Sequence, residues 1–532
     1  MSWIGPNGGS HTQDGLSARK PAHQRERPRQ FGRASRETRG WKYPASVASL
    51  ADCTVRSTSP PVSRLPPHLH PSASIESDSS KRVPSRQALW HPLGVTRRFA
   101  FLLVWLALTA EVKPTIFQGK WETPLTTLGT AIFTGLPGVH FPLWDLMVFA
   151  TTAVALAQAG ARKGRVAPLL RSIHFTLGSL AAAWIWGVVL QGGSAYQTMF
   201  QLHQFVVGMV VAYMLMATCR TMRHIEGLGK VVLFATIYRA FVLLIFYVLV
   251  ARHLETELNA LTEHQDTALF VTGLILLLAH AAHRRSIRSA LWASVAAVPV
   301  VLAIYLNSRR LAWVAVVAGL GLIYALLPKD QFKRRMNTFI WSISPLLLGY
   351  VAIGWGQPTG IFKPVGSIST MFGEHQDTSS VMRDIENYNL TKTLKSNPLL
   401  GLGWGHEYFE LVAAYRISGG FPQYRYMPHN SLLGVLAFSG MLGFIGTCQI
   451  FPVAAFLHMR AYLAARTPAA RTGALVGIVA IMVCVLEMWG DLGFNGGTTN
   501  VVVGASLAVA GRLPALVGGW AAPQSTEPGH NV

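Results

Sequence analysis

The sequence contains few charged residues for its length. Only 13% of its 532 residues are Asp, Glu, Lys or Arg, whereas 51% are hydrophobic. Because soluble globular domains carry roughly twice this charged fraction, the composition excludes an ordinary soluble protein and indicates many membrane-spanning segments. The formal net charge of +22 does not indicate nucleic-acid binding, since the basic residues gather in one tail and in short connections between apolar segments.

Cysteine is also scarce. The four cysteines, Cys53, Cys219, Cys448 and Cys484, show neither a CxxC motif nor paired spacing. We therefore expect neither a disulfide framework nor a cysteine-ligated zinc site, and the sequence predicts no metal site and no cofactor.

Residues 1–98 differ from the rest of the chain. They contain 16 Lys or Arg against 6 Asp or Glu, many Ser and Pro, and no periodic apolar pattern. Such a composition cannot bury enough apolar surface to fold, so we expect disorder. Two interpretations stay open: a cytoplasmic tail attracted to anionic membrane lipid, or a gene-model extension with translation starting near Val83 or Val95.

Apolar runs that can cross a bilayer, which takes about 17–25 residues, occur at twelve places. They are 99–112, 143–160, 169–190, 199–218, 231–251, 267–283, 289–306, 311–327, 337–355, 429–450, 472–490 and 498–513. The Gly- and Pro-interrupted stretch 123–142 is expected to be interfacial or re-entrant. The sequence thus predicts an all-α polytopic membrane protein with about 12 transmembrane helices and a disordered tail at 514–532.

The connections alternate in charge along the chain. One set carries seventeen Lys or Arg residues and the other short connections carry five. By the positive-inside rule the basic set is cytoplasmic, and so are both termini. Residues 308–310 and the long loop 356–428 then face the opposite, periplasmic side of a bacterial inner membrane.

Polar motifs stand where two apolar runs begin. Ser308-Arg309-Arg310 precedes one run, and His429-Asn430 opens another. Ionisable groups at such positions are costly to desolvate and usually functional. Since both motifs are predicted to face outward, they can share one site.

The long loop adds further candidates. Residues 379–396 are compatible with a helix that places Arg383 and Glu386 on one face. Gly401, Gly403 and Gly405 alternate with other residues, and such glycines let backbone N–H groups approach a phosphate. A plain turn is the other interpretation of the glycine pattern.

In combination these motifs resemble the O-antigen ligase/polymerase superfamily of bacterial membrane glycosyltransferases. The resemblance covers about residues 289–450. It rests on Ser308-Arg309, on Arg383 followed by Pro398 to Gly403, and on His429-Asn430-Ser431 followed by Gly440 and Gly443. Segments 99–288 and 451–513 are expected to supply the remaining transmembrane helices.

The resemblance implies transfer of a glycan from an undecaprenyl-diphosphate carrier to an acceptor hydroxyl, without a metal. The acceptor is a glycan or lipid-A core, and polysaccharide-assembly proteins are possible partners. Arg309 and Arg383 would stabilise the diphosphate leaving group, and His429 would take the acceptor proton. Ser308, Arg310, Glu386, Asn430 and the three glycines would bind substrate.

Arg239, in the middle of segment 231–251, must face the bundle interior or a cavity. It either lines the lipid-diphosphate groove or pairs with Glu487 or Asp491. Two other functions stay open for the chain: a transporter of lipid-glycan or small molecules, disfavoured because the sequence shows no internal repeat, and an inactive scaffold of a polysaccharide export complex. The sequence departs from the family pattern at Arg310, Asn387 and Phe438-Ser439, and these departures keep the scaffold function open as an alternative. The pattern does not separate ligase from polymerase.

Overall fold

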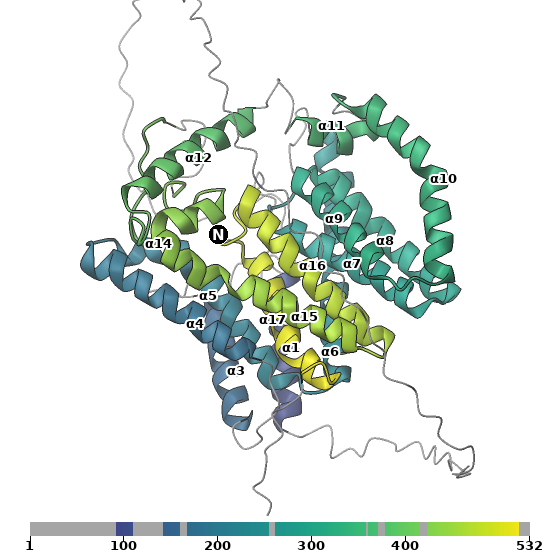
Figure 1. The fold of residues 1–532 in the computed structure, drawn as a ribbon, viewed down its shortest axis with the longest axis horizontal. Helices are drawn as coiled ribbons and strands as arrows, with labels where there is room; N and C mark the ends of the chain where they lie inside the picture. Colours follow the sequence, from purple (N-terminus) through teal and green to yellow (C-terminus); the bar gives the residue numbers. More distant parts are fainter. Residues whose placement is uncertain are drawn as a thin grey trace, which may run out of the picture. The chain divides into compact units, whose positions relative to one another are not determined.

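The computed structural model describes residues 92–109, 142–159, 168–254, 261–357, 360–370, 378–413 and 423–520. Within these ranges the regular structure is helical (Figure 1). Ten of the helical segments are long and apolar enough to cross a membrane, and the shorter apolar helices α3 and α9 complete the twelve expected places. The chain is an all-α polytopic membrane protein, as the sequence predicts.

The first half of the chain contributes α1 (Pro92–Thr109), α3 (Leu143–Ala159), α4 (Leu169–Trp184) continued by the π-helix η2 (Ile185–Leu190), α5 (Ala195–Thr218), α6 (Met222–Leu249) with the short η3 (Ala251–His253), and α7 (Asp266–Arg284). The second half contributes α8 (Ile287–Asn307), α9 (Arg310–Leu326), α10 (Gln331–Gly354), η4 (Gly360–Phe362), α11 (Lys363–Ser369), α12 (Thr378–Ser396), α14 (Ser431–Cys448), α15 (Ile450–Ala464), α16 (Pro468–Gly490) and α17 (Gly497–Leu516).

Helix α17 lies at the centre of the bundle, and 83% of its apolar window is buried. Small residues allow this close packing, as expected for helices within lipid. A Cβ on Gly504 would lie 2.5 Å from the carbonyl oxygen of Gly208 on α5. Two buried apolar clusters flank the centre: one includes α1, α3, α4, α5, α14 and α15, and the other includes α6 to α9. Helix α16 contributes to both.

Several predicted boundaries are wrong at helix ends. Helix α1 begins at Pro92, inside the stretch expected to be disordered, because Pro suits the first helical position. Helix α6 begins at Met222, since a helix can continue beyond the hydrocarbon layer where water solvates Arg223 and Lys230. Helix α17 extends to Leu516, into the expected C-terminal tail. Residues 1–91 and 123–141 lie outside the described residues.

The predicted span 429–450 requires a larger correction. The apolar helical segment extends from Ser431 to Ala464, 34 residues, which is more than the roughly 20 residues of one straight crossing. Gly440, at φ 62°, interrupts α14 with a kink. The predicted span 429–450 therefore covers two parts of a bent helix rather than one straight crossing. Residues expected to form the following connection, Arg460 among them, belong to α15.

Candidate active site

Five segments distant in sequence meet at the end of the bundle that carries α11 and α12. They are the turn before α7, the link between α8 and α9, helix α12, the N-terminus of α14 and the residue that follows α16. In Figure 1 the upper end of α16 lies between α12 and α14 on one side and α9 and α11 on the other. The long loop predicted at 356–428 therefore includes folded helices, and the expected helix at 379–396 is confirmed as α12.

Asp491, which caps the C-terminus of α16, joins three of these segments. Its Oδ2 atom contacts Nδ1 of His264 and lies 3.9 Å from a guanidinium nitrogen of Arg383. Burial by itself raises the pKa of Asp491, but His264, Arg383 and Arg309 together lower that pKa below its ordinary value. Asp491 is therefore an ionised carboxylate at neutral pH, and it holds two guanidinium groups near one point.

Arg309 reaches the same cluster from the link between α8 and α9. Its guanidinium donates to the carbonyl of Thr262 at 3.1 Å and lies 3.3 Å from Nε2 of His264. Asn307 fixes the facing turn, since its side-chain oxygen accepts from the backbone N–H of Thr262 at 3.0 Å. Ser308 adopts the left-handed conformation, φ 57°, which turns the chain sharply between the two helices. Ser308 thus positions Arg309 through the backbone.

His264 is held in a defined state by these contacts. Burial lowers its pKa, and the attraction of Asp491 opposes this only in part. We assign the neutral tautomer with hydrogen on Nδ1, because Asp491 can accept from that nitrogen while Nε2 accepts from Arg309. His264 therefore links the carboxylate to the buried arginine.

His429 and Glu386 form a second polar pair in the site. The Glu386 carboxylate, fully buried on α12, accepts the backbone N–H of His429 at 3.0 Å. Ring Nδ1 of His429 lies 3.4 Å from both carboxylate oxygens. The His429 side chain is 18% exposed. A carboxylate at Nδ1 favours hydrogen on that atom and leaves Nε2 available to accept a proton.

Asn430 and Arg310 contact the same helix. The Asn430 side chain caps α14 by accepting from Leu433 N–H at 3.1 Å, and it donates to Asn387 on α12 at 3.0 Å. Arg310 donates to the hydroxyls of Thr370 at 3.2 Å and Ser380 at 3.1 Å. Both residues hold α12 against the bundle, and Arg310 adds a third guanidinium to this end.

The three glycines serve a different purpose from the phosphate cradle suggested by their spacing. Their N–H groups donate to the Asn397 carbonyl, the Phe438 carbonyl and the Gln201 side chain, for Gly401, Gly403 and Gly405 respectively. All three have positive φ. A Cβ on Gly401 would lie 2.5 Å from the backbone nitrogen of Gly440. Gly401 thus allows the loop to pack into the kink of α14, whereas Gly403 and Gly405 allow it to pass close to Gly187 and Ser194. The N–H donors of all three glycines are already used inside the protein.

Arg239 is part of the bundle interior. Its guanidinium forms an ion pair with Asp266 at 2.7 Å and donates to Thr498 at 3.0 Å and to the Leu108 carbonyl at 3.2 Å. Arg239 and Asp266 are both fully buried. Of the two expected environments, the structure favours the structural ion pair, and the acid is Asp266, which the sequence analysis did not suggest.

Two residues of the cluster were not predicted as site residues. His264 and Asp491 each stand where a transmembrane segment meets its connection, on the same predicted side as Arg309. The signal used for Arg309 and His429, an ionisable group at a lipid boundary, applies equally to them. Among the described residues, no three His, Cys, Asp or Glu side chains converge as ligands for a metal.

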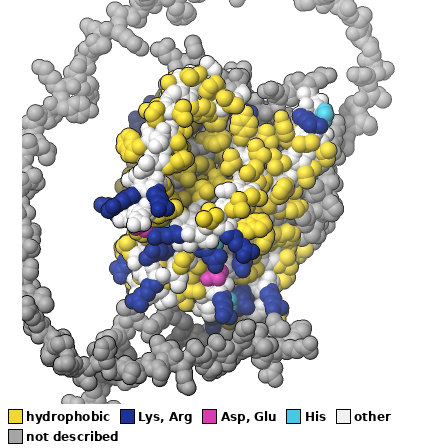
Figure 2. Space-filling view, turned by 90° about the vertical axis from the view of Figure 1, so that its right-hand side faces the viewer, with side chains coloured by type: hydrophobic (Ala, Val, Ile, Leu, Met, Phe, Trp, Pro, Cys, Tyr) yellow, Lys and Arg dark blue, Asp and Glu magenta, His cyan; other side chains and the backbone are white. Residues whose placement is uncertain are grey.

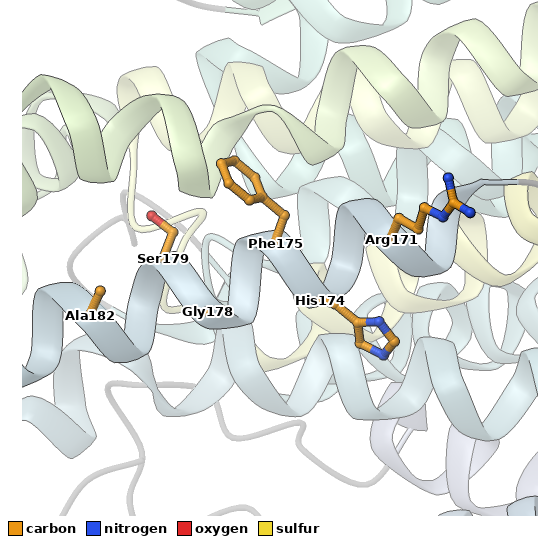
Figure 3. Close-up of a pocket in the computed structure, with 6 residues that line it drawn as sticks. All are labelled: Arg171, His174, Phe175, Gly178, Ser179 and Ala182. Carbon is orange, nitrogen blue, oxygen red and sulfur yellow. The ribbon is translucent and has the colours of Figure 1, made fainter.

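A hollow of about 640 Å³ lies elsewhere in the molecule, along α4 (Figure 3). It is lined by Arg171, His174, Phe175, Gly178, Ser179 and Ala182. Ser179 of this lining packs against Gly446 in the second half of α14. The kink at Gly440 lies between that part of α14 and His429. The lining provides no group of acid, base and arginine like that around Asp491, so the hollow is not the chemical site.

The fold and this cluster define a polytopic membrane protein with a strongly charged site at one end of its helices. A family model described as O-Antigen ligase matches residues 295–448, and this confirms the resemblance seen in the motifs and supports membership of the O-antigen ligase superfamily. The family indicates a membrane enzyme that transfers glycan, with a lipid-linked donor and a polysaccharide acceptor in general terms. A search of curated proteins found no match.

Proposed function

We propose that the protein transfers a glycan from an undecaprenyl-diphosphate carrier to an acceptor hydroxyl at the periplasmic face of the bacterial inner membrane. One observation carries the proposal: Arg309 and Arg383, from separate segments, converge on Asp491 beside the His429–Glu386 pair. The guanidinium groups of Arg309 and Arg383 bring several charged N–H donors from separate segments to one place. An anionic diphosphate is the natural ligand for such a site.

The arginines would act on the leaving group. As the bond between the sugar anomeric carbon and the diphosphate oxygen breaks, negative charge grows on the diphosphate. Arg383 is 30% exposed, and its 3.9 Å separation from Asp491 is beyond hydrogen-bond range. Its donors can therefore turn to the phosphate oxygens, whereas Arg309, fixed by Thr262 and His264, supplies a permanent charge. In this proposal the guanidinium groups take the place of a metal ion.

His429 would act on the nucleophile. The acceptor hydroxyl loses its proton to Nε2 while its oxygen bonds to the anomeric carbon and the diphosphate leaves. Glu386 holds the ring through Nδ1 and stabilises the imidazolium that forms, the role of the carboxylate in a catalytic triad. Because Glu386 is buried behind His429, its role is to position the base rather than to bind substrate.

Reconstituted transfer tests the proposal. Purified full-length protein in lipid nanodiscs would receive an undecaprenyl-diphosphate-linked oligosaccharide, with EDTA present, and either the same lipid-linked glycan or lipid-A core as acceptor. Elongation of the glycan would identify a polymerase, and labelled lipid-A core would identify a ligase. Movement of intact donor across a sealed bilayer without transfer would instead identify a transporter. Loss of transfer in EDTA, restored by Mg²⁺, would contradict the metal-free mechanism.

A further inference from the structure

Asn387 lies on α12 at the point where this helix meets the start of α14. It follows Glu386, which holds His429, and its own side chain contacts Asn430. Arg383 stands one helical turn earlier on α12, and residues four positions apart share a helix face. Asn387 therefore stands on the side of α12 that faces the site, beside both the proposed base and one of the arginines.

Two hydrogen bonds fix the orientation of the Asn387 amide. The backbone N–H of Leu433 can only donate, so the side-chain oxygen of Asn430 must face it, at 3.1 Å. The Asn430 nitrogen is then turned toward Asn387, whose side-chain oxygen accepts from it at 3.0 Å. The Asn387 nitrogen, which carries two N–H donors, is left on the other side of the amide.

The side-chain N–H donors of Asn387 have no partner among the described residues. The side chain is half-buried, and its nitrogen is open to solvent. Asn389, two positions later on α12, differs in this respect. Its oxygen accepts from the N–H groups of Leu411 and Val412, and its nitrogen donates to the Val412 carbonyl. Asn389 thus ties the loop to α12, whereas Asn387 offers donors to a ligand.

Asn387 lies at the end of the molecule that a polar sugar can reach. Figure 2 shows a broad apolar surface along the helices, with Lys and Arg gathered toward its lower end. Figure 1 shows α12 at the upper end of the bundle. A sugar can therefore approach α12 without entering the apolar layer that this surface indicates.

The position of Asn387 relative to Arg383 suits the sugar of a glycan diphosphate. One helical turn rises about 5.4 Å, so a ligand whose diphosphate contacts Arg383 extends along α12 toward Asn387. In such a ligand the anomeric carbon is bonded to a diphosphate oxygen, and carbon 2 follows it directly. The substituent on carbon 2 lies only a few bonds from the phosphorus, within the reach of one helical turn.

We propose that Asn387 donates a hydrogen bond to the oxygen of the carbon 2 substituent, a hydroxyl or an acetamido carbonyl, on the sugar attached to the donor diphosphate. This inference rests on the proposed function. The partner must be a hydrogen-bond acceptor, because the Asn387 oxygen is already used by Asn430. Hydrogen bonds at carbon 2 strengthen as the anomeric carbon becomes positive in the transition state. Asn387 therefore selects donors whose first sugar carries this oxygen.

Donors that differ only at carbon 2 test the contact. The undecaprenyl-diphosphate oligosaccharide would carry glucose, N-acetylglucosamine or 2-deoxyglucose as its first sugar, with one fixed acceptor. The readout is the ratio of kcat/KM for the better oxygen-bearing donor to kcat/KM for the 2-deoxy donor. Asn387→Leu should lower this ratio about three- to tenfold, the worth of one neutral hydrogen bond. Loss of the oxygen also changes the intrinsic reactivity of the donor, but that change is common to both proteins and cancels.

Asn430→Asp tests the orientation of the amide. The new carboxylate still caps α14 by accepting from the Leu433 N–H, but it cannot donate to Asn387. The Asn387 nitrogen then turns toward this carboxylate, and its oxygen turns toward the sugar. The ratio should fall as in Asn387→Leu, with a melting temperature close to wild type. Lys395→Gln, at an exposed position of the same helix, is the control and should keep the wild-type ratio.

Binding separates this inference from the proposed function. Dissociation constants of the three glycans in nanodiscs, measured without acceptor, require no turnover. A preference for the oxygen-bearing glycans that is lost in Asn387→Leu, without any transfer, would keep the contact and reject the proposed function. Transfer with the same ratio in wild type and Asn387→Leu would keep the function and overturn the contact. Equal binding of the three glycans without transfer would reject both.

Discussion

Glu386 accepts the backbone N–H of His429 at 3.0 Å and lies 3.4 Å from the ring Nδ1 of the same residue. The two contacts fix both the start of α14 and the orientation of the imidazole. A buried carboxylate that holds a partly exposed histidine in this manner is typical of an oriented general base.

Replacement of His429 by Ala should slow transfer about 10²–10⁴-fold, the usual worth of general-base assistance, with little change in donor KM. Glu386→Gln should also lower kcat, because an amide does not reproduce the carboxylate that orients Nδ1. Residues that act as a unit are not additive, so the double variant should be little slower than His429→Ala. Steady-state kinetics on all three would show this, and fully multiplicative losses would contradict the pairing.

Replacement of Arg309 and replacement of Arg383 should lower activity to a similar extent but should lower stability to different extents. Each Arg→Gln variant should lose about 2–4 kcal/mol of transition-state stabilisation, by analogy with lost oxyanion donors. Arg383→Gln should change the free energy of unfolding by only about 0–1 kcal/mol, since its ion pair is long and partly exposed. Arg309→Gln should cost about 3–5 kcal/mol, because it leaves buried partners unsatisfied.

Transfer rates and thermal melting of the same preparations provide the two readouts for this pair. Arg383→Lys serves as the conservative control, and it should recover little activity because an ammonium cannot reproduce the planar fork of donors. Normal turnover in both Gln variants would rule out an arginine clamp on the diphosphate.

His264 should make stability depend on pH. Its pKa in the folded protein is lowered by burial, so its contribution is complete above the ordinary value of about 6.5 and declines as pH falls below that value. The lowered pKa of Asp491 matters only below about pH 4. Melting temperature should therefore drop less between pH 7 and pH 5 in His264→Gln than in wild type. His253→Gln, at an exposed position, is the control, and an unchanged drop in His264→Gln would refute the assignment.

Gly440 should not tolerate a side chain. Its backbone, at φ 62° and ψ −172°, lies in a region that is essentially confined to glycine and costs an L-residue about 1–3 kcal/mol, and an added Cβ would lie 2.3 Å from the carbonyl of Leu399. Gly440→Ala should reduce the amount of folded protein and its melting temperature. Gly349→Ala, in α10 with open space around it, should be neutral or stabilise by up to about 1 kcal/mol. Similar behaviour of the two variants would argue against the kink.

The orientation in the membrane can be tested with single cysteines in a cysteine-free background. The charge pattern predicts that Lys395→Cys, on α12, reacts with an impermeant maleimide in intact spheroplasts. Gln331→Cys, at the start of α10, should react only after permeabilisation. Both positions are exposed, so access rather than burial decides the result. The reverse pattern would place the site on the cytoplasmic side and remove the proposed donor.

The sequence alone determined the helices and the motifs at their ends. Runs such as 289–306 and 472–490 are long and apolar, and in lipid a chain of that kind must satisfy its backbone donors within a helix. Arg309 and His429 could be selected because an ionisable group at a lipid boundary is costly and its position is visible in the local sequence. Arg383 was selected from its spacing to Pro398–Gly403, which resembles the family pattern. The kink at Gly440 was not predicted from the apolar pattern, since glycine is compatible with both a straight and a bent transmembrane helix.

Only the tertiary structure decided how these residues combine. Asp491 and His264 become the link between two arginines because α16, α7 and α12 end at one place, and Glu386 supports His429 because α12 lies against the start of α14. The glycines near Gly403 serve packing because their donors meet Phe438 and Gln201. Arg239 likewise has its partner on another helix. These outcomes depend on contacts between segments distant in sequence, which no local pattern of residues encodes.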